Sequence, residues 1–270
     1  MIKFFRDTRK ALVSDGNTGK YLKYAIGEIL LVVVGILIAL QVSNWNANVQ
    51  LDKKELTFLS QIDTDLENIA SDMHADYISL KLGERSHFRI TDYINNNSSF
   101  KDSMCFDFYW LMKDEYIYPI KSTYDAIKEE GLSIIKNDSI RQGIQAAYEN
   151  IFPRISKANP FFPDLEEFFS SYYQKNFKIN KDTSLVMNEQ FPYYQIKYPY
   201  QKNVNGKTYP ITVGFIPKNF EDFKKDDSFQ VLMRQAYIYR SYKISRYRGG
   251  KEYIEKLRGI IARELKRRNK

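Results

Sequence analysis

The sequence predicts a mainly α-helical protein with one N-terminal transmembrane helix that continues into a long stalk helix. Three observations carry this prediction. The run between Tyr21 and Trp45 is almost wholly apolar, a helical apolar stripe follows it, and β-type residues gather in only one short segment. After the stalk we expect an exported, bundle-like helical domain with a small β-hairpin.

The apolar run is long enough to cross a bilayer. From Ala25 to Leu40, Glu28 is the only charged residue. At about 1.5 Å per residue, a helix from Ala25 to Val42 approaches the roughly 30 Å of the hydrocarbon core. Tyr24 and Trp45 lie at its two edges, where amphipathic rings prefer the membrane interface. We therefore predict a transmembrane helix over residues 21–45 and the lipid bilayer as its partner.

A cleaved signal peptide is the competing interpretation. Its apolar region would be about 7–15 residues long and would end in a small-x-small site. The run here is longer, and Ala39-Leu40-Gln41 is a poor cleavage site. An uncleaved signal-anchor explains the segment better.

The flanking charges predict the orientation. Six Lys and Arg residues precede the span with two acids, whereas residues 46–76 contain two lysines and seven acids. The positive-inside rule therefore places the N-terminus in the cytoplasm and the C-terminal domain in the periplasm of a bacterial inner membrane. Residues 1–20 form a basic amphipathic leader that can lie on the inner leaflet. A frayed basic leader is the alternative.

Two features inside the span are candidate partner sites. Glu28 is an ionisable group within an apolar helix, so it is a candidate contact for another subunit. It also lies one turn from Tyr24 and Lys23, from where it can reach the headgroups instead. Gly35 and Ala39 form a small-xxx-small pattern that permits close helix approach. The expected protein partners of this face are a second copy of the chain or another envelope protein.

The stalk is predicted over residues 46–82. Apolar residues recur there at spacings of three and four, from Leu56 to Leu80, which is typical of one face of a helix. No Pro or Gly lies between Ile36 and Leu82. We therefore expect span and stalk to be nearly continuous, with a shorter helix after Gly83.

Residues 83–270 form the exported domain. Short helices with local start and stop residues are predicted up to Asn176. Near residues 193–216 the composition becomes β-branched and aromatic around Asn205-Gly206, which predicts a hairpin. Two helices, near 228–247 and 250–268, are expected on either side of Gly249-Gly250.

The charge distribution predicts which helices pack together. The stalk residues 52–76 carry seven acids and two lysines, whereas residues 251–270 carry eight basic groups and three acids. We expect these two helices to lie side by side, with apolar stripes supplying the stability and charges selecting the partner. A basic tail that contacts lipid headgroups, or is simply solvated, remains the alternative.

Arg240 is a separate candidate. It falls within the apolar face of the helix near 228–247, where a charge must find a partner. The prediction is a buried ion pair or a contact with an anionic ligand.

No residue pattern predicts catalysis, a cofactor or a metal site. His74 and His87 are the only histidines, and their spacing fits no metal motif. Neither histidine has an evident nucleophile nearby in the sequence. The net charge of +8 arises at the two ends of the chain, so it does not indicate nucleic-acid binding.

The N-terminal segment resembles a known family. Gly19-Lys-Tyr-Leu-Lys-Tyr-Ala-Ile-Gly-Glu-Ile29, Gly35-Ile-Leu-Ile-Ala-Leu-Gln41 and Asn44-Trp45-Asn46 are similar to the opening of single-pass membrane proteins of Bacteroidota, catalogued as a domain of unknown function. A weaker likeness continues through Gly131-Leu132 to Tyr148. The resemblance implies a membrane anchor and supplies no catalytic residues.

Two functions are therefore expected. The first is a membrane-anchored, non-enzymatic module that binds, senses or scaffolds outside the membrane. The second is an accessory subunit of an envelope transporter or signalling complex, which contacts partner helices through Glu28 and Gly35.

Overall fold

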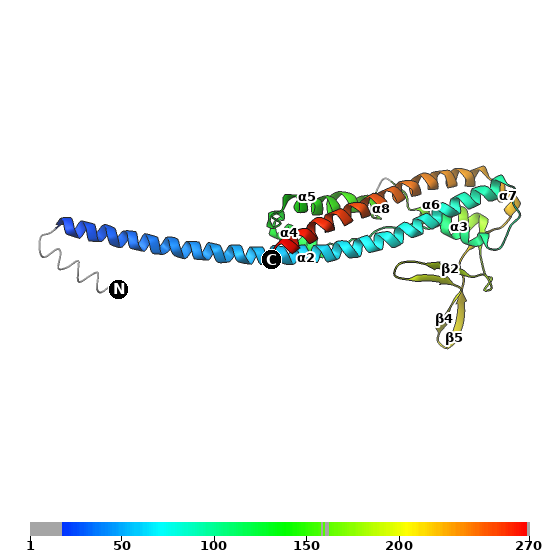
Figure 1. Ribbon diagram of the computed structural model, residues 1–270. Coiled ribbons are helices and arrows are strands. Elements are labelled where there is room, and N and C mark those ends of the chain that lie inside the picture. The colour runs from blue at the N-terminus through cyan, green and yellow to red at the C-terminus, as the bar shows by residue number, and fades with distance from the viewer. Residues whose placement is uncertain (1–17, 158, 160–161, 269–270) are drawn as a thin grey trace. The chain divides into compact units, whose positions relative to one another are not determined.

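The computed structural model describes residues 18–157, 159 and 162–268, and it divides the chain into two units, Met1–Thr57 and Phe58–Lys270 (Figure 1). The helical elements are α2 (Thr18–Asn95), α3 (Met104–Met112), α4 (Ser122–Glu130), η1 (Leu132–Ile134), α5 (Asp138–Ala146), η2 (Ala147–Ile151), η3 (Phe152–Ile155), α6 (Leu165–Asn176), α7 (Phe220–Lys224) and α8 (Asp227–Arg268). The strands are β1 (Phe177–Ile179), β2 (Met187–Gln190), β3 (Gln195–Tyr198), β4 (Tyr200–Val204), β5 (Lys207–Ile211) and β6 (Phe215–Pro217). The predicted class, mainly α with small β elements, is confirmed.

The first unit contains the apolar part of α2. Among the described residues one helix is long and apolar enough to cross a membrane. Its most apolar window has a mean hydropathy of 2.5, and none of that window is buried. Leu30, Val33 and Leu37 are all exposed there. The predicted leader falls mostly on residues 1–17, which lie outside the described residues.

The second unit is organised around an antiparallel pair of long helices. The part of α2 after Thr57 runs antiparallel to α8. As residue numbers rise along α2, the residues that they contact on α8 have falling numbers. Asp63 contacts Arg258, Asp76 contacts Tyr247, and His87 stacks on Tyr237. Figure 1 shows α8 running along this part of α2. The expected packing of the stalk against the C-terminal helix is confirmed.

Two apolar clusters lie at opposite ends of this helix pair. One joins α2 and α8 to α4, α5 and the short helices that follow, around Leu59, Tyr148 and Ile261. The other joins them to α3, α6, α7 and β1, around Phe108, Phe169 and Phe229. Short helices without a wide apolar face of their own gain stability by packing on the long pair.

The C-terminal region is one helix and not the two that were expected. α8 passes through Gly249 and Gly250 without interruption. A Cβ on Gly250 would lie 2.9 Å from Cε of Met73 and 3.1 Å from Cγ2 of Ile151. The missing side chain therefore allows close packing at that residue, and the burial of the helix face outweighs the low helix propensity of glycine.

The stalk also extends further than expected, because α2 continues through Gly83 to Asn95. A Cβ on Gly83 would lie 2.7 Å from Nε of Arg240 and 2.8 Å from the carbonyl oxygen of Trp110. Gly83 is thus a point of close approach between three elements and not a helix end.

The β region contains three two-stranded sheets in place of a single hairpin. β4 and β5 pair across Asn205-Gly206, whose φ angles of 52° and 76° match the positive values that a type I′ turn requires. β3 pairs antiparallel with β2, the strand that precedes it in the sequence, and β1 pairs antiparallel with β6. The Asn-Gly turn is confirmed, but the hairpin that it closes contains only β4 and β5, and Gln195–Tyr198 pairs with β2 instead. Turn chemistry specifies only the strands directly beside it.

Candidate functional site

The candidates predicted in the span lie on the apolar part of α2. Glu28 is partly exposed, and Ala39 is exposed. A Cβ on Gly35 would meet no atom within 4 Å, and Trp45 is 69% exposed. The backbone of Tyr24 is helical, while its side chain lies outside the described residues. This face is sterically open along Gly35 and Ala39.

Arg240 is fully buried where α8 crosses α2 and α3. Its Nη2 donates to the carbonyl oxygens of Leu111, at 2.5 Å, and Lys113, at 3.0 Å. These carbonyls belong to the C-terminal end of α3, where helical carbonyls lack partners within the helix and the helix dipole is negative. Burial lowers the pKa of Arg240 to about 10, so the guanidinium stays charged at neutral pH.

Next to Arg240, Asp114 and Lys243 form a buried ion pair. Lys243 Nζ lies 2.6 Å from Oδ2 of Asp114, and both side chains are almost completely buried. The same carboxylate accepts hydrogen bonds from the hydroxyl of Tyr116, at 2.8 Å, and from the backbone N–H of Leu165, at 2.9 Å. The backbone N–H of Glu115 donates to the other oxygen, Oδ1, at 3.0 Å. Four donors therefore compensate the desolvated charge, and the pair ties α8 to the start of α6.

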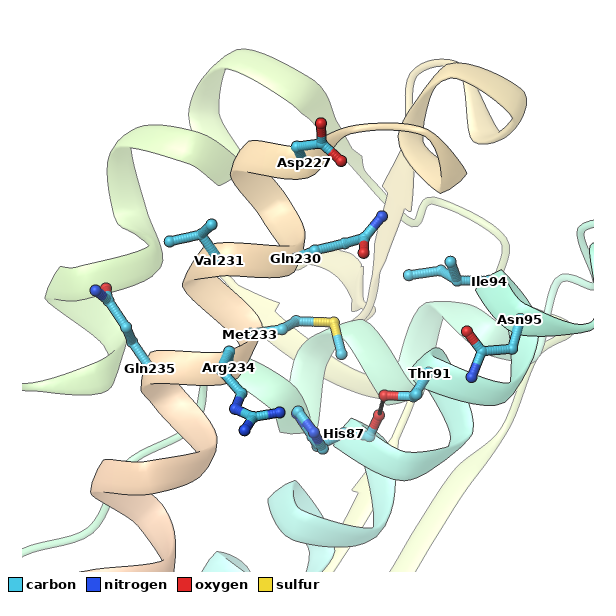
Figure 2. Close-up of a pocket in the computed structure, with 10 residues that line it drawn as sticks. All are labelled: His87, Thr91, Ile94, Asn95, Asp227, Gln230, Val231, Met233, Arg234 and Gln235. Atoms are coloured by element: carbon cyan, nitrogen blue, oxygen red, sulfur yellow. Dashed lines mark hydrogen bonds between the residues drawn. The ribbon is translucent and has the colours of Figure 1, made fainter.

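A groove of about 690 Å³ lies between the last turns of α2 and the first turns of α8 (Figure 2). The residues that line it come in helical spacing from both elements: His87, Thr91, Ile94, Asn95, Asp227, Gln230, Val231, Met233, Arg234 and Gln235. Figure 2 shows Arg234 and His87 close together at one end of the groove and Asp227 at the other. The groove thus has a basic end and an acidic end.

His87 is the most constrained polar residue in the groove. Its ring stacks on Tyr237 with 4.8 Å between the centroids, and the ring of Phe88 meets it edge-on at 5.4 Å. Burial, followed by the nearby charges of Arg240 and Arg234, lowers the pKa of His87 to about 4. Its Nδ1 is buried and has no hydrogen-bond partner among the described residues. The imidazole is therefore neutral at pH 7 and keeps one ring nitrogen unused.

These groups can bind a ligand by hydrogen bonds and charge. Arg234 offers N–H donors to an acceptor or anion, while Thr91 already donates its hydroxyl hydrogen to the carbonyl of His87, at 2.9 Å. Ile94 and Met233 add apolar surface. A mixed lining of this kind is typical of binding sites for small molecules or peptide segments.

Sequence reasoning missed this groove. Helix α2 was expected to break at Gly83, so His87 and Asn95 were not placed on the same helix as the stalk. The opposite charges of residues 52–76 and 251–270 could have revealed it. Asp63 contacts Arg258. If the same antiparallel pairing continues along both helices, His87 lies near Tyr237, as the structure shows.

The fold and the groove define a class of protein: a mainly helical chain with an antiparallel pair of long helices in its larger unit and a helix apolar enough to cross a membrane. Residues 28–190 match a family of unknown function (DUF6090). Because this match covers more than half of the chain, the protein belongs to that family. No curated protein and no solved structure matches it significantly. Membership in an uncharacterised family was predicted and is confirmed.

Proposed function

We propose that this protein is an uncleaved, single-pass membrane protein whose second unit binds, senses or scaffolds outside the cytoplasm. The observation that carries the proposal is the contrast within α2. None of its apolar window is buried, whereas from Phe58 onwards the same helix contributes to a buried core. Continuous apolar surface of this kind is unfavourable in water and favourable in lipid.

The proposed orientation places the N-terminus in the cytoplasm of a bacterial inner membrane and residues 58–270 in the periplasm. The support is the excess of Lys and Arg before the span and of acids after it. The likeness of the segment from Gly19 to Asn46 to membrane proteins of Bacteroidota supports a cell envelope with two membranes. The proposed partners are lipid and either a second copy or another envelope protein, not nucleic acid.

The proposed activity is binding and not catalysis. The groove supports this, because it combines a cation, amides and apolar side chains around a neutral imidazole. Nδ1 of His87 has no hydrogen-bond partner among the described residues, whereas a general-base histidine uses one ring nitrogen to bond an orienting group.

Reporter fusions test the topology. A reporter active only in the cytoplasm and one active only in the periplasm are each fused after residue 15 and after residue 270 of the full chain. We expect the cytoplasmic reporter to work at the first position and the periplasmic one at the second. The same compartment at both positions would refute the anchor, and release of the protein by alkaline carbonate would refute membrane insertion.

A second candidate function is that of an accessory subunit that contacts partner helices through Glu28 and Gly35. The open space around Gly27 and Gly35 favours it, since neither residue has an atom near the position of a Cβ. Photocrosslinking from position 35 in intact membranes, with position 33 as a control on the opposite face of the helix, tests this proposal. A specific protein adduct from position 35 alone is expected, and recovery of lipid only would contradict it.

A further inference from the structure

A basic recess lies on another side of the second unit, between α8 and the short helices η2 and η3. Its volume is about 460 Å³. The described residues that line it include no acidic side chain. Its polar lining residues are Asn150, Arg154, Tyr242, Ser245, Arg246 and Tyr253. Two segments that are far apart in the sequence therefore bring two arginines to one space.

Arg246 is oriented by an aromatic ring. Its Cζ lies over the ring of Tyr242, 4.8 Å from the centroid, and that ring stacks on Phe162 with 4.2 Å between the centroids. This contact holds the guanidinium without supplying an acceptor for its N–H donors. Arg246 is also half-buried, so part of its charge is shielded from bulk water. A ligand with acceptor oxygens meets a guanidinium that is already in position.

Two carboxylates that flank the recess along the chain have other partners. Glu149 accepts a hydrogen bond from the hydroxyl of Tyr124, at 2.7 Å. Glu255 lies 3.7 Å from Nζ of Lys251. Glu252 is exposed and is not one of the lining residues. An anion that enters the recess therefore meets two arginines and no carboxylate among the described lining residues.

Gly249 lines the recess and leaves the backbone of α8 open there. Inside a helix, glycine is less favourable than alanine. Packing explains the neighbouring Gly250, where a Cβ would lie 2.9 Å from Cε of Met73, but a Cβ on Gly249 would meet no atom within 4 Å. Packing therefore does not explain Gly249, whereas close approach of a ligand to the helix backbone does.

The opposite wall contains a π-helical turn. This turn, η2, supplies Asn150 and Ile151 to the recess, and η3 adds Arg154. Single π-helical turns are rare in proteins and often lie at functional sites. The wall thus provides an amide and a second guanidinium opposite Arg246.

We propose that this recess binds a phosphate group, with Arg154 and Arg246 as its charged ligands. A guanidinium binds phosphate through two parallel hydrogen bonds, and two guanidinium groups match the nearly two negative charges of a phosphate monoester at pH 7. The volume is within the range of small-molecule sites, so the group that carries the phosphate has room beside Ile151 and Tyr253. The site is separate from the groove at His87, and the proposal does not depend on the orientation in the membrane.

The phosphate can come from a small solute or from a lipid headgroup. Full-length protein in neutral detergent micelles and phosphate-free buffer is titrated with inorganic phosphate or glycerol 3-phosphate at constant ionic strength. Micelles that contain phosphatidylglycerol present the lipid headgroup, and acetate is the carboxylate control. We expect saturable binding by calorimetry and a higher melting temperature with a phosphate probe, since a ligand that binds only the folded state stabilises it. Binding of the soluble probes alone would assign a solute, and an effect of the lipid alone would assign a headgroup.

Four variants locate the ligand. R154Q and R246Q should each weaken binding at least about tenfold, as expected for the loss of a charge-assisted contact. R248Q removes the same charge from an exposed residue of α8 outside the recess and should leave the affinity unchanged. G249L keeps both arginines but places a side chain in the recess. It should abolish binding without loss of stability, because leucine favours helix.

Several results would overturn the proposal. No binding of any phosphate probe would refute a phosphate site. Acetate that binds as tightly as phosphate would show that the recess does not select a phosphate group. Equal losses in R246Q and R248Q would show an effect of net charge alone, and unchanged affinity in folded G249L would place the ligand elsewhere. None of these results bears on the anchor, which the reporter fusions test separately.

Discussion

At the scale of single residues, the second unit depends on polar groups buried where α2, α3 and α8 meet. Arg240 satisfies carbonyls at the end of α3, and Lys243 neutralises Asp114 beside it. Removing one partner of such a pair leaves an uncompensated buried charge, which is strongly destabilising. These buried contacts therefore stabilise the packing of α8 against α2 and α3.

Two glycines in helices have opposite predicted effects when changed to alanine. G83A should lower the free energy of unfolding by about 1–3 kcal/mol, because the new Cβ would overlap Arg240 and the backbone of Trp110. G249A should raise it by about 0.5–1 kcal/mol, because nothing lies within 4 Å of that Cβ and alanine favours helix. Urea unfolding of both variants measures the difference. Stabilisation by both changes would refute the close approach at Gly83.

A pH dependence is expected from Asp76. Burial, followed by the charge of Glu115, raises its pKa to about 7, while the hydroxyl of Tyr247 donates a hydrogen bond to it. Asp72 also raises this pKa, and Lys243 lowers it. Since the pKa is higher in the folded state, folding favours the protonated form. The free energy of unfolding should therefore fall as the pH rises from about 4 to about 7. The total decrease is about 1.4 kcal/mol for each unit by which the pKa of Asp76 in the folded state exceeds its pKa in the unfolded state.

The variant D76N tests this dependence. Its neutral amide should remove most of the slope between pH 4 and 7 and make it more stable than the wild type at pH 8. Chemical unfolding at several pH values gives the comparison. Glu115 has a raised pKa as well, through burial, so a slope of the same sign should remain in D76N. An unchanged pH profile in D76N would contradict the assignment.

At the scale of elements, the antiparallel pairing of α2 and α8 determines the positions of all the smaller elements. The apolar face of the pair supplies the stability, and charges at its edge select the register. Arg258 contacts Asp63 at 3.0 Å and 3.3 Å and Glu67 at 3.3 Å. A two-point contact of a partly buried arginine with a carboxylate is stronger than an ordinary surface ion pair.

A charge exchange tests this contact. D63R and R258D should each lower the free energy of unfolding by about 1 kcal/mol or more, because each places like charges side by side. The double variant restores opposite charges and should recover part of the loss. Thermal unfolding of the four proteins forms a double-mutant cycle. Additive losses would show that the two side chains do not interact.

At the scale of the whole molecule, the two units differ in where their apolar side chains lie. The core of the second unit begins at Phe58, and the apolar window of α2 contributes nothing to it. A fragment of residues 50–270 should therefore remain soluble, unfold cooperatively and keep the circular dichroism of its helices. The full chain should enter the detergent phase in a phase-partition assay. Aggregation of the fragment without a cooperative transition would show that the second unit needs the first.

The sequence by itself determined the local features of this protein. The apolar run from Ala25 to Leu40, the stripe from Leu56 to Leu80 and the Asn205-Gly206 turn each depend on neighbouring residues, so their patterns could be read directly. The packing of residues 52–76 against 251–270 was also predictable, because both segments have an apolar stripe and their net charges are opposite. Membership in an uncharacterised family was also predicted from the sequence.

Only the tertiary structure decided which glycines end a helix and which permit close packing. Gly83, Gly249 and Gly250 look alike in a sequence, but the first and the last face neighbouring elements and none of them interrupts its helix. The groove at His87 was likewise not predictable, because its walls come from segments more than a hundred residues apart in the sequence. Long-range contacts of this kind depend on how whole faces fit together, and a local residue pattern contains no information about that fit.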